Sequence, residues 1–488
     1  MPTKAAIAIA CQAAVAVAMA GPLAAQDSAG VRADRVERSL LPVTRVHGRH
    51  YLPATIIERM RTYNVPAVSV AVIDQGRILW ARAYGWADVE QQRAATTTTI
   101  FQAASMSKPV TAVAALQLVE SGSLWLDSSV NCSLHSWTLP MTELSARHPV
   151  TLRELLTHTA GLTVHGFAGY APGATLPTVP QLLDGLPPAN SPAVRVEATP
   201  GTAWSYSGGG FMIVQMLLTD VTQQPFPDLL TRHVLDPMGM RNSAFEHPLA
   251  EEHRSVAALG YLANDSLVPG GFHVHPELAA AGLWTTPSDL ANWILAMQAA
   301  VRGDAGALLT PAMAQAMMTP GLGGWGLGVQ IRGSGDTALF THGGANVGYR
   351  AAFYGFVHRP SGVVVMTNGD GGAALVEEVA HAVAAEYGWP GFAPHVVTPA
   401  HLEPAVVREW AGTYAQGTVR AIITVDDDAS HIRLSGGDLP TTEPLEIIPL
   451  SRDRFITADG ALTARIIRDA GGAIDSINIG GTPFKRLP

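Results

Sequence analysis

Residues 101–120, FQAASMSKPVTAVAALQLVE, combine a short turn with an apolar helix. Small and apolar side chains fill positions 110–119, so we predict a helix that is buried on most sides. Pro109 fits only the first turn of a helix, where its missing N–H costs no hydrogen bond. Ser105 is therefore predicted at the helix N-terminus, with Lys108 three residues later on the same face.

This arrangement suits a nucleophilic serine. A serine hydroxyl reacts only when a neighbouring base activates it. A lysine in an apolar, partly desolvated site loses its proton near neutral pH. Free N–H groups at the helix N-terminus would stabilise a developing oxyanion. The pattern Ser-x-x-Lys also describes an N-cap followed by a solvated lysine, but its position before an apolar helix favours the catalytic interpretation.

Composition limits the classes of function. The chain has 488 residues, of which 47% are hydrophobic and 15% charged, enough for two or three domains. The net charge is −9 without basic clusters, which argues against a nucleic-acid partner. The sequence gives no indication of oligomeric state.

The first 25 residues have the pattern of a secretory signal peptide. Lys4 precedes the apolar run 5–20, and GPLAAQ follows, so we predict cleavage after Ala25. An uncleaved anchor is the alternative, but the run is short and rich in alanine. Without it, Cys132 is the one remaining cysteine, so no internal disulfide can form. We therefore expect a periplasmic or secreted bacterial protein with no stable membrane insertion after cleavage.

Strand patterns near both chain ends enclose a long helical region. The predicted helices are 54–63, 152–161, 211–218, a segment following Pro287, and 373–387. The predicted strands are 66–74, 77–85, 325–331, 338–348, 350–357 and 362–368. Residues 163–200 are predicted to be a loop that walls a site. This order predicts an α+β fold, with one antiparallel sheet flanked by helices and a large helical insertion.

The chain divides into a main domain and a smaller one. We predict the main domain over 26–390, beginning with a polar arm at 27–50. A Pro-rich linker follows at 391–404. Short β-like runs separated by turns then predict a small all-β barrel or sandwich at 405–488.

Three histidines outside the serine motif invite attention. His158 is interpreted as a residue that bonds the last carbonyls of its helix. His273 and His275 are too few for a metal site, because about three convergent ligands are needed. We therefore predict no metal and no cofactor.

Three motifs occur in a fixed order: Ser105-x-x-Lys108, Tyr206-Ser-Gly208 and His342-Gly-Gly344. Together they resemble the serine β-lactamase and penicillin-binding-protein superfamily. The resemblance is to its class C-like branch, which includes esterases and D-stereospecific peptidases. It covers roughly residues 45–390, and the runs 155–162, 280–287 and 342–349 support it.

The resemblance implies a β-lactamase/transpeptidase-like fold and a role for each motif residue. Ser105 would be the acylated nucleophile, while Lys108 and Tyr206 share the proton transfers. Which of the two is the base stays open. His342 would help hold the substrate and titrate near neutrality.

Two backbone N–H groups would form the oxyanion hole, those of Ser105 and Ala345. Gly344 would let the substrate lie along the strand edge.

Two departures from the superfamily pattern bear on activity. Gly208 stands where the second motif usually has Asn, and His342 where β-lactamases have Lys. Both argue against an efficient β-lactamase. We expect an exported serine hydrolase acting on small-molecule or peptide esters or amides, resembling an esterase or D-peptidase.

The motifs are also compatible with other functions. One alternative is a β-lactamase or D,D-carboxypeptidase, and another is a non-catalytic module that binds penicillin or senses peptidoglycan. An α/β-hydrolase is disfavoured because no G-x-S-x-G occurs.

Overall fold

The computed structural model describes residues 21–417, 419–436, 444–458, 460, 462–479 and 482–488. The predicted signal peptide, residues 1–25, lies mostly outside this range. Within it, no helix is both long enough and apolar enough to cross a bilayer.

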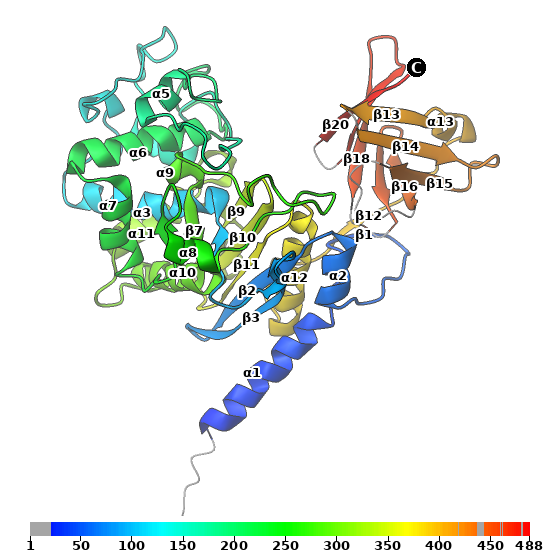
Figure 1. Cartoon of the computed structure of the whole chain (residues 1–488), viewed down its shortest axis with the longest axis horizontal. Coiled ribbons are helices and arrows are strands. Elements are labelled where there is room, and N and C mark those ends of the chain that lie inside the picture. Colours follow the sequence, from blue (N-terminus) through cyan, green and yellow to red (C-terminus); the bar gives the residue numbers. More distant parts are fainter. Residues whose placement is uncertain (1–20, 418, 437–443, 459, 461, 480–481) are drawn as a thin grey trace, which may run out of the picture.

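A seven-stranded antiparallel sheet forms the centre of the main domain, in the order β4-β3-β2-β11-β10-β9-β8 (Figure 1). The strand bounds are β2 Ala67–Asp74, β3 Arg77–Asp88, β4 Arg93–Ala94, β8 Gln330–Arg332, β9 Leu339–Asn346, β10 Tyr349–Phe356 and β11 Gly362–Thr367. The predicted hairpin is confirmed, since β2 and β3 join through the left-handed residues Gln75 and Gly76. Strands from both chain ends meet where β2 pairs with β11, as predicted.

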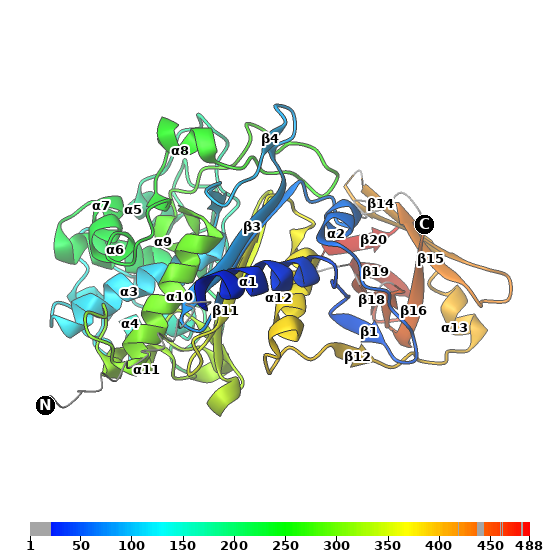
Figure 2. The ribbon, with the colours of Figure 1, turned by 90° about the horizontal axis from the view of Figure 1, so that it is seen from below.

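Helices cover both faces of this sheet (Figure 2). α10 (Pro287–Arg302) packs on one face, and α12 (Gly372–Tyr387) with α2 (Ile56–Thr62) on the other. Successive residues of β2 point to opposite faces of the sheet. Ala71 and Ile73 belong to the hydrophobic core on the α10 side, and Val70 and Val72 to the core on the α12 side. The sheet therefore contributes to a hydrophobic core on each of its two faces.

The helical insertion surrounds α3 (Ser107–Glu120), which is buried from Ser107 to Leu116. The other helices there are α4 Leu152–Thr157, α5 Val179–Asp184, α6 Gly208–Thr222, α7 Phe226–Leu230, α8 Glu251–Val256, α9 Leu278–Ala281 and α11 Pro311–Met317. Two predictions are corrected here. α4 ends at Thr157 rather than Gly161, because His158 adopts a left-handed conformation with φ 57°. The predicted loop 163–200 contains the helix α5, which a Thr178 capping box begins.

The predicted polar arm at 27–50 is wrong. α1 (Gly21–Glu37) packs against α12, with Arg35 hydrogen-bonded to Glu386 at 2.5 Å. β1 (Thr44–Val46) then pairs in parallel with β12 (His395–Val397). The linker is therefore tied to the N-terminal segment rather than being a plain spacer.

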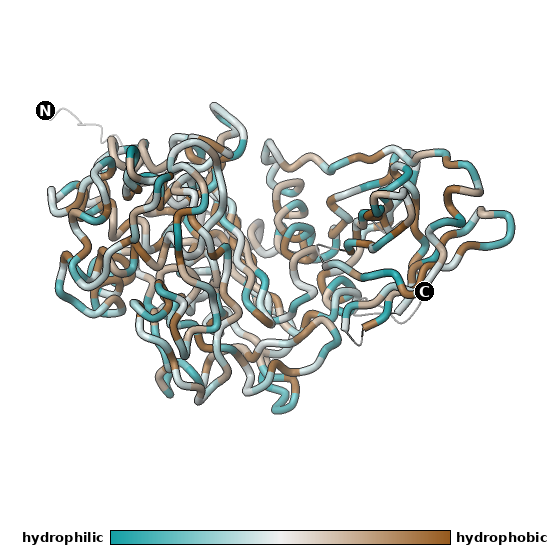
Figure 3. Tube along the Cα trace, turned by 90° about the horizontal axis from the view of Figure 1, so that it is seen from above, coloured by the Kyte–Doolittle hydropathy of each residue, from teal (hydrophilic) through white to brown (hydrophobic). Residues whose placement is uncertain are grey.

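The C-terminal part is a closed barrel of eight antiparallel strands, preceded by α13 (Pro404–Arg408). Its strands are β13 Gly412–Gln416, β14 Val419–Val425, β15 Ile432–Gly436, β16 Leu445–Ser451, β17 Arg454–Thr457, β18 Thr463–Arg468, β19 Ile474–Ile479 and β20 Thr482–Arg486. Its core is separate from the two of the main domain, and Trp410, Tyr414 and Phe455 are fully buried there. Hydrophobic and hydrophilic stretches alternate along both parts of the chain, and several outer loops are hydrophilic (Figure 3).

Candidate active site

Ser105 lies at a sharp turn between a strand and a helix. β5 (Phe101–Gln102) pairs with β7 (Leu283–Thr285), and a 3-10 turn (Ala104–Met106) then leads into α3. Ala104 has φ 48°, an uncommon conformation for a residue with a side chain. The Ser107 hydroxyl secures the turn by donating to the Ala104 carbonyl at 2.6 Å and accepting from the Leu283 N–H. The nucleophile predicted from sequence is thus at the helix N-terminus.

Lys108 is buried beneath this serine. Its Nζ lies 3.0 Å from the Ser105 Oγ and donates to the carbonyl of Ala280, in α9, at 2.7 Å. The side chain is only 2% exposed, and this burial lowers the pKa of Lys108 to about 7. The amine is therefore able to accept a proton near neutral pH.

Tyr206 joins the same site from a distant segment. It stands just before α6, whose N-cap Ser207 accepts from the Gly210 N–H at 3.1 Å. The Tyr206 side chain lies beside Ser105, and the Lys108 Nζ lies 5.1 Å from its ring centroid. Burial raises the pKa of Tyr206, and the interaction with the Ser105 hydroxyl opposes this shift. The phenol is therefore protonated at neutral pH.

His342, on β9, faces the site in its neutral form. Burial and the nearby Lys108 lower the pKa of His342 to about 3. The prediction that it titrates near neutrality is therefore wrong. The Nδ1 lies 2.7 Å from the Gly343 carbonyl, which can only accept, so Nδ1 carries the proton. The buried Nε2 then offers a lone pair, and the described residues give it no partner.

β9 passes close to the serine turn. A Cβ on Gly344 would lie 2.2 Å from the Ala103 carbonyl oxygen, so only glycine allows this approach. Ala345 follows and lines the same cavity. Both residues thus lie beside Ser105. The role of Ala345 in the oxyanion hole and that of Gly344 in substrate binding stay predictions.

The prediction that His158 bonds the last carbonyls of its own helix is wrong. Its ring does not bond the helix carbonyls; instead, its Nδ1 accepts from the Ser207 N–H at 3.2 Å. The ring lies on Tyr206, with centroids 4.2 Å apart, and burial keeps the pKa of His158 well below its usual value. His158 thereby fixes the phenol through contacts on both its ring and its backbone. No local pattern reveals this, because positions 158 and 206 meet only in the folded chain.

Aromatic side chains close one wall of the site. The centroid of the Trp325 ring lies 4.7 Å from that of His158 and 5.2 Å from that of His342. The Trp204 ring stacks on Trp325, with 5.9 Å between the ring centroids. The cavity beside them has a volume of about 510 Å³ and contains Ser105. It is large enough for a small-molecule or short peptide substrate. Sequence reasoning had placed Trp325 in a strand and missed its position in the wall.

An asparagine at position 208 would crowd the neighbouring loop. A Cβ there would lie 2.9 Å from the Phe167 ring and 3.3 Å from the His165 carbonyl oxygen, so the Phe167 side chain would have to shift.

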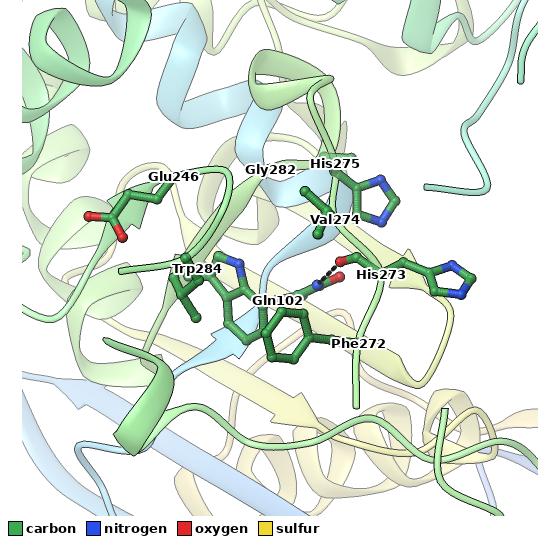
Figure 4. Close-up of a pocket in the computed structure, with 10 residues that line it drawn as sticks. Gln102, Glu246, Phe272, His273, Val274, His275, Gly282 and Trp284 are labelled. Carbon is green, nitrogen blue, oxygen red and sulfur yellow. Dashed lines mark hydrogen bonds between the residues drawn. The ribbon is translucent and has the colours of Figure 1, made fainter. Parts of the chain in front are cut away.

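A second, enclosed cavity of about 10 Å³ lies behind the site (Figure 4). Gln102 donates there to the His273 carbonyl at 2.8 Å and accepts from the Asn346 amide. The two histidines diverge, since the His273 ring donates to Ala168 and His275 faces Glu277 at 3.7 Å. No group of three His, Cys, Asp or Glu is placed to hold a metal among the described residues. This region braces β5 rather than receiving a substrate.

The family model named Beta-lactamase matches residues 52–387, the whole region that forms the sheet and its helical insertion. The chain belongs to the beta-lactamase family. The resemblance inferred from the three motifs is thereby confirmed.

Two curated proteins are also similar to this chain. Protein flp of Staphylococcus aureus strain MW2 is 26% identical over 252 residues, which cover 49% of this chain and 47% of that protein. Esterase EstB of Burkholderia gladioli is 30% identical over 203 residues, 40% of this chain and 50% of the esterase. The chain thus spans about half the length of the curated relatives that it matches.

Solved structures confirm the β-lactamase/transpeptidase-like fold. The octameric penicillin-binding protein homologue from Pyrococcus abyssi has a TM-score of 0.60 at 22% identity, over 87% of this chain and 96% of that one. The structure of SurE with D-Leu has a TM-score of 0.56 at 22% identity, and the match covers 95% of this chain and 100% of that one. A class C beta-lactamase has a TM-score of 0.53 at 22% identity, and the match covers 68% of this chain and 93% of that one. At these identities the likeness concerns the fold alone.

Proposed function

We propose that this protein is an exported serine hydrolase that cleaves ester or amide bonds through an acyl-enzyme on Ser105. The observation that carries the proposal is the 3.0 Å contact between the Ser105 Oγ and the Lys108 Nζ. That contact places a nucleophile beside an amine able to exchange protons near neutral pH.

Lys108 takes the hydroxyl proton as the Ser105 Oγ bonds to the substrate carbonyl carbon. The resulting oxyanion collapses and the bond to the leaving group breaks, while Tyr206 gives that group its proton and regains one from Lys108. Water then attacks the acyl ester and gives up a proton to Lys108, and this proton returns to the Ser105 Oγ as the acid product leaves. The raised pKa of Tyr206 favours Lys108 as the base, because a protonated phenol cannot accept the serine proton.

The likeness to Esterase EstB supports ester cleavage. Amide cleavage by a D-peptidase rests on the resemblance of the three motifs. Gly208 and the neutral His342 argue against efficient β-lactam hydrolysis. Export is proposed from the N-terminal sequence, and N-terminal sequencing of periplasmic material should begin at Gln26.

The test is a panel of p-nitrophenyl butyrate, D-amino-acid p-nitroanilides and nitrocefin, assayed on one preparation. We expect ester or anilide hydrolysis with weak nitrocefin turnover. Ser105→Ala should lower turnover by at least about 10³-fold without changing the circular dichroism spectrum. Undiminished hydrolysis by purified Ser105→Ala would remove the mechanism.

A second candidate, a module that binds without turnover, is favoured by the glycine at position 208. A fluorophosphonate would then label Ser105, while labelled penicillin would stay bound without release. Burst kinetics followed by steady turnover of the butyrate ester would decide for the hydrolase.

A further inference from the structure

The cavity at Ser105 continues past the edge of β9 to helix α12. β8 pairs with β9 only from Leu339 to Thr341, so from His342 onward this edge faces the cavity. The next residues along the edge carry little or no side chain, and the cavity passes over them to α12, where Ala373, Val376 and Glu377 line it. A substrate held at Ser105 therefore has space to extend toward this helix.

The described residues that line this cavity offer a substrate no uncompensated positive charge. His342 is neutral, with its proton on Nδ1. Arg350 is the one arginine in the lining, and its NH1 is held at 3.0 Å by Asp370 and donates to two backbone carbonyls. The Arg350 charge is thus already compensated within the fold.

Glu377 is the one carboxylate in the lining. It is half-buried and accepts from the Tyr354 hydroxyl at 2.5 Å. Throughout the part of the chain that the structure describes, no lysine or arginine comes within ion-pair distance of it, although Arg332 and His381 line an adjoining small cavity with it. A partly desolvated carboxylate without a cationic partner attracts a cation and repels a second carboxylate.

We propose that this extension of the cavity binds the far end of the acyl group, and that Glu377 selects an ammonium group there over a carboxylate. The inference rests on the proposed hydrolase function and deepens it. The preferred substrates are amine-bearing acyl compounds, such as esters or amides of amino acids and short peptides with a free amine. The neutral His342 adds to the selection, since it offers no positive charge to a carboxylate near Ser105.

Three p-nitrophenyl esters of equal chain length test the selection: 6-aminohexanoate, hexanoate and the adipate monoester. They share the scissile bond and leaving group and differ only in the charge at the far end. We expect kcat/KM to be at least about tenfold higher for the aminohexanoate than for the adipate at low ionic strength. Salt should reduce this ratio, because Glu377 is only partly buried.

Variants assign the effect to the carboxylate. Glu377→Gln should lower the ratio of aminohexanoate to adipate at least fivefold, and Glu377→Lys should invert it. Tyr354→Phe keeps the carboxylate and should retain the preference. Glu386→Gln, on the same helix but paired with Arg35 outside the cavity, is the matched control and should leave the ratio unchanged.

The proposal is overturned if wild type hydrolyses the three esters with equal kcat/KM, or if both Glu377 variants keep the wild-type ratio. If wild type hydrolyses none of them, the hydrolase proposal fails instead. Calorimetric titration of Ser105→Ala with 6-aminohexanamide and with adipamate then decides the preference of the cavity alone. Tighter binding of the amine supports the selection, and equal or weaker binding removes it.

Discussion

Burial lowers the pKa of the Lys108 amine to about 7, so close to half of the molecules carry a neutral amine at that pH. Only the neutral form can accept the proton of Ser105. We therefore expect kcat/KM for p-nitrophenyl butyrate to rise with pH and level off above about pH 8. The midpoint should fall near 7, far below the value of about 10.4 for a solvated lysine.

The measurement is a pH–rate profile of kcat/KM between pH 5 and 9. His342 should not contribute to it, because the pKa of His342 lies near 3. A profile that is flat over this range would contradict the assignment of Lys108 as the base. The control is the same profile for His401→Gln, since this exposed histidine lies in the linker, outside the cavity lining.

Some residues of the site could be predicted from the sequence, and others could not. Ser105 and Lys108 could be predicted because they are three residues apart on one helix, where spacing alone brings them together. Tyr206 and His342 came from resemblance, since their approach depends on how the insertion folds. His158 and Glu377 could not be found, because what each side chain touches depends on segments far away in the sequence.

At the scale of elements, the approach of β9 to the serine turn depends on Gly344. We expect Gly344→Ala to push β9 away from the turn, because its Cβ would lie 2.2 Å from the Ala103 carbonyl oxygen. The cost should be about 1–3 kcal/mol of folding stability. Activity should fall at least about 10²-fold, since displacements near 1 Å disturb the reacting groups.

Thermal unfolding and the butyrate assay measure both effects. Gly343→Ala is the matched control for stability, because its Cβ would meet no atom closer than 3.8 Å. Its melting temperature should stay within about 2 °C of wild type. Equal melting temperatures for wild type and Gly344→Ala would show that β9 can shift freely.

Helices and strands that a pattern in their own sequence marks were predicted well. Elements that form only through pairing or packing with distant segments were missed. The β2–β3 hairpin and α3 follow from alternation, turn residues and apolar composition. β1 is only three residues long and pairs with a strand about 350 residues later, so no local pattern marks it. α1 was mistaken for an arm because its stability comes from packing on α12 rather than from its own sequence.

At the scale of the whole molecule, the β1–β12 pair ties the N-terminal segment to the linker before the barrel. Arg45 sits in the middle of this ladder, opposite Val396. Arg45→Pro should break the pair, because proline donates no hydrogen bond. We expect limited proteolysis within residues 388–404 to become at least fivefold faster.

Arg49→Ala is the control for this experiment. It removes an exposed ion pair with Glu446, at 2.8 Å, that is worth about 0–1 kcal/mol. Cleavage of this variant should stay within twofold of wild type. If Arg45→Pro resists proteolysis equally well, the barrel is held by contacts other than this ladder.

The pairing of β2 with β11 also has a consequence during synthesis. The hairpin of β2 and β3 can form early, but the strand that covers its other edge ends only at Thr367. At about 5–20 residues per second, a ribosome needs roughly 15–60 s to make the intervening chain. For that interval a row of valines stands with an open hydrogen-bonding edge, which is a template for aggregation. The nascent chain is therefore expected to need a chaperone or an export factor to protect this hairpin until its partner strand emerges.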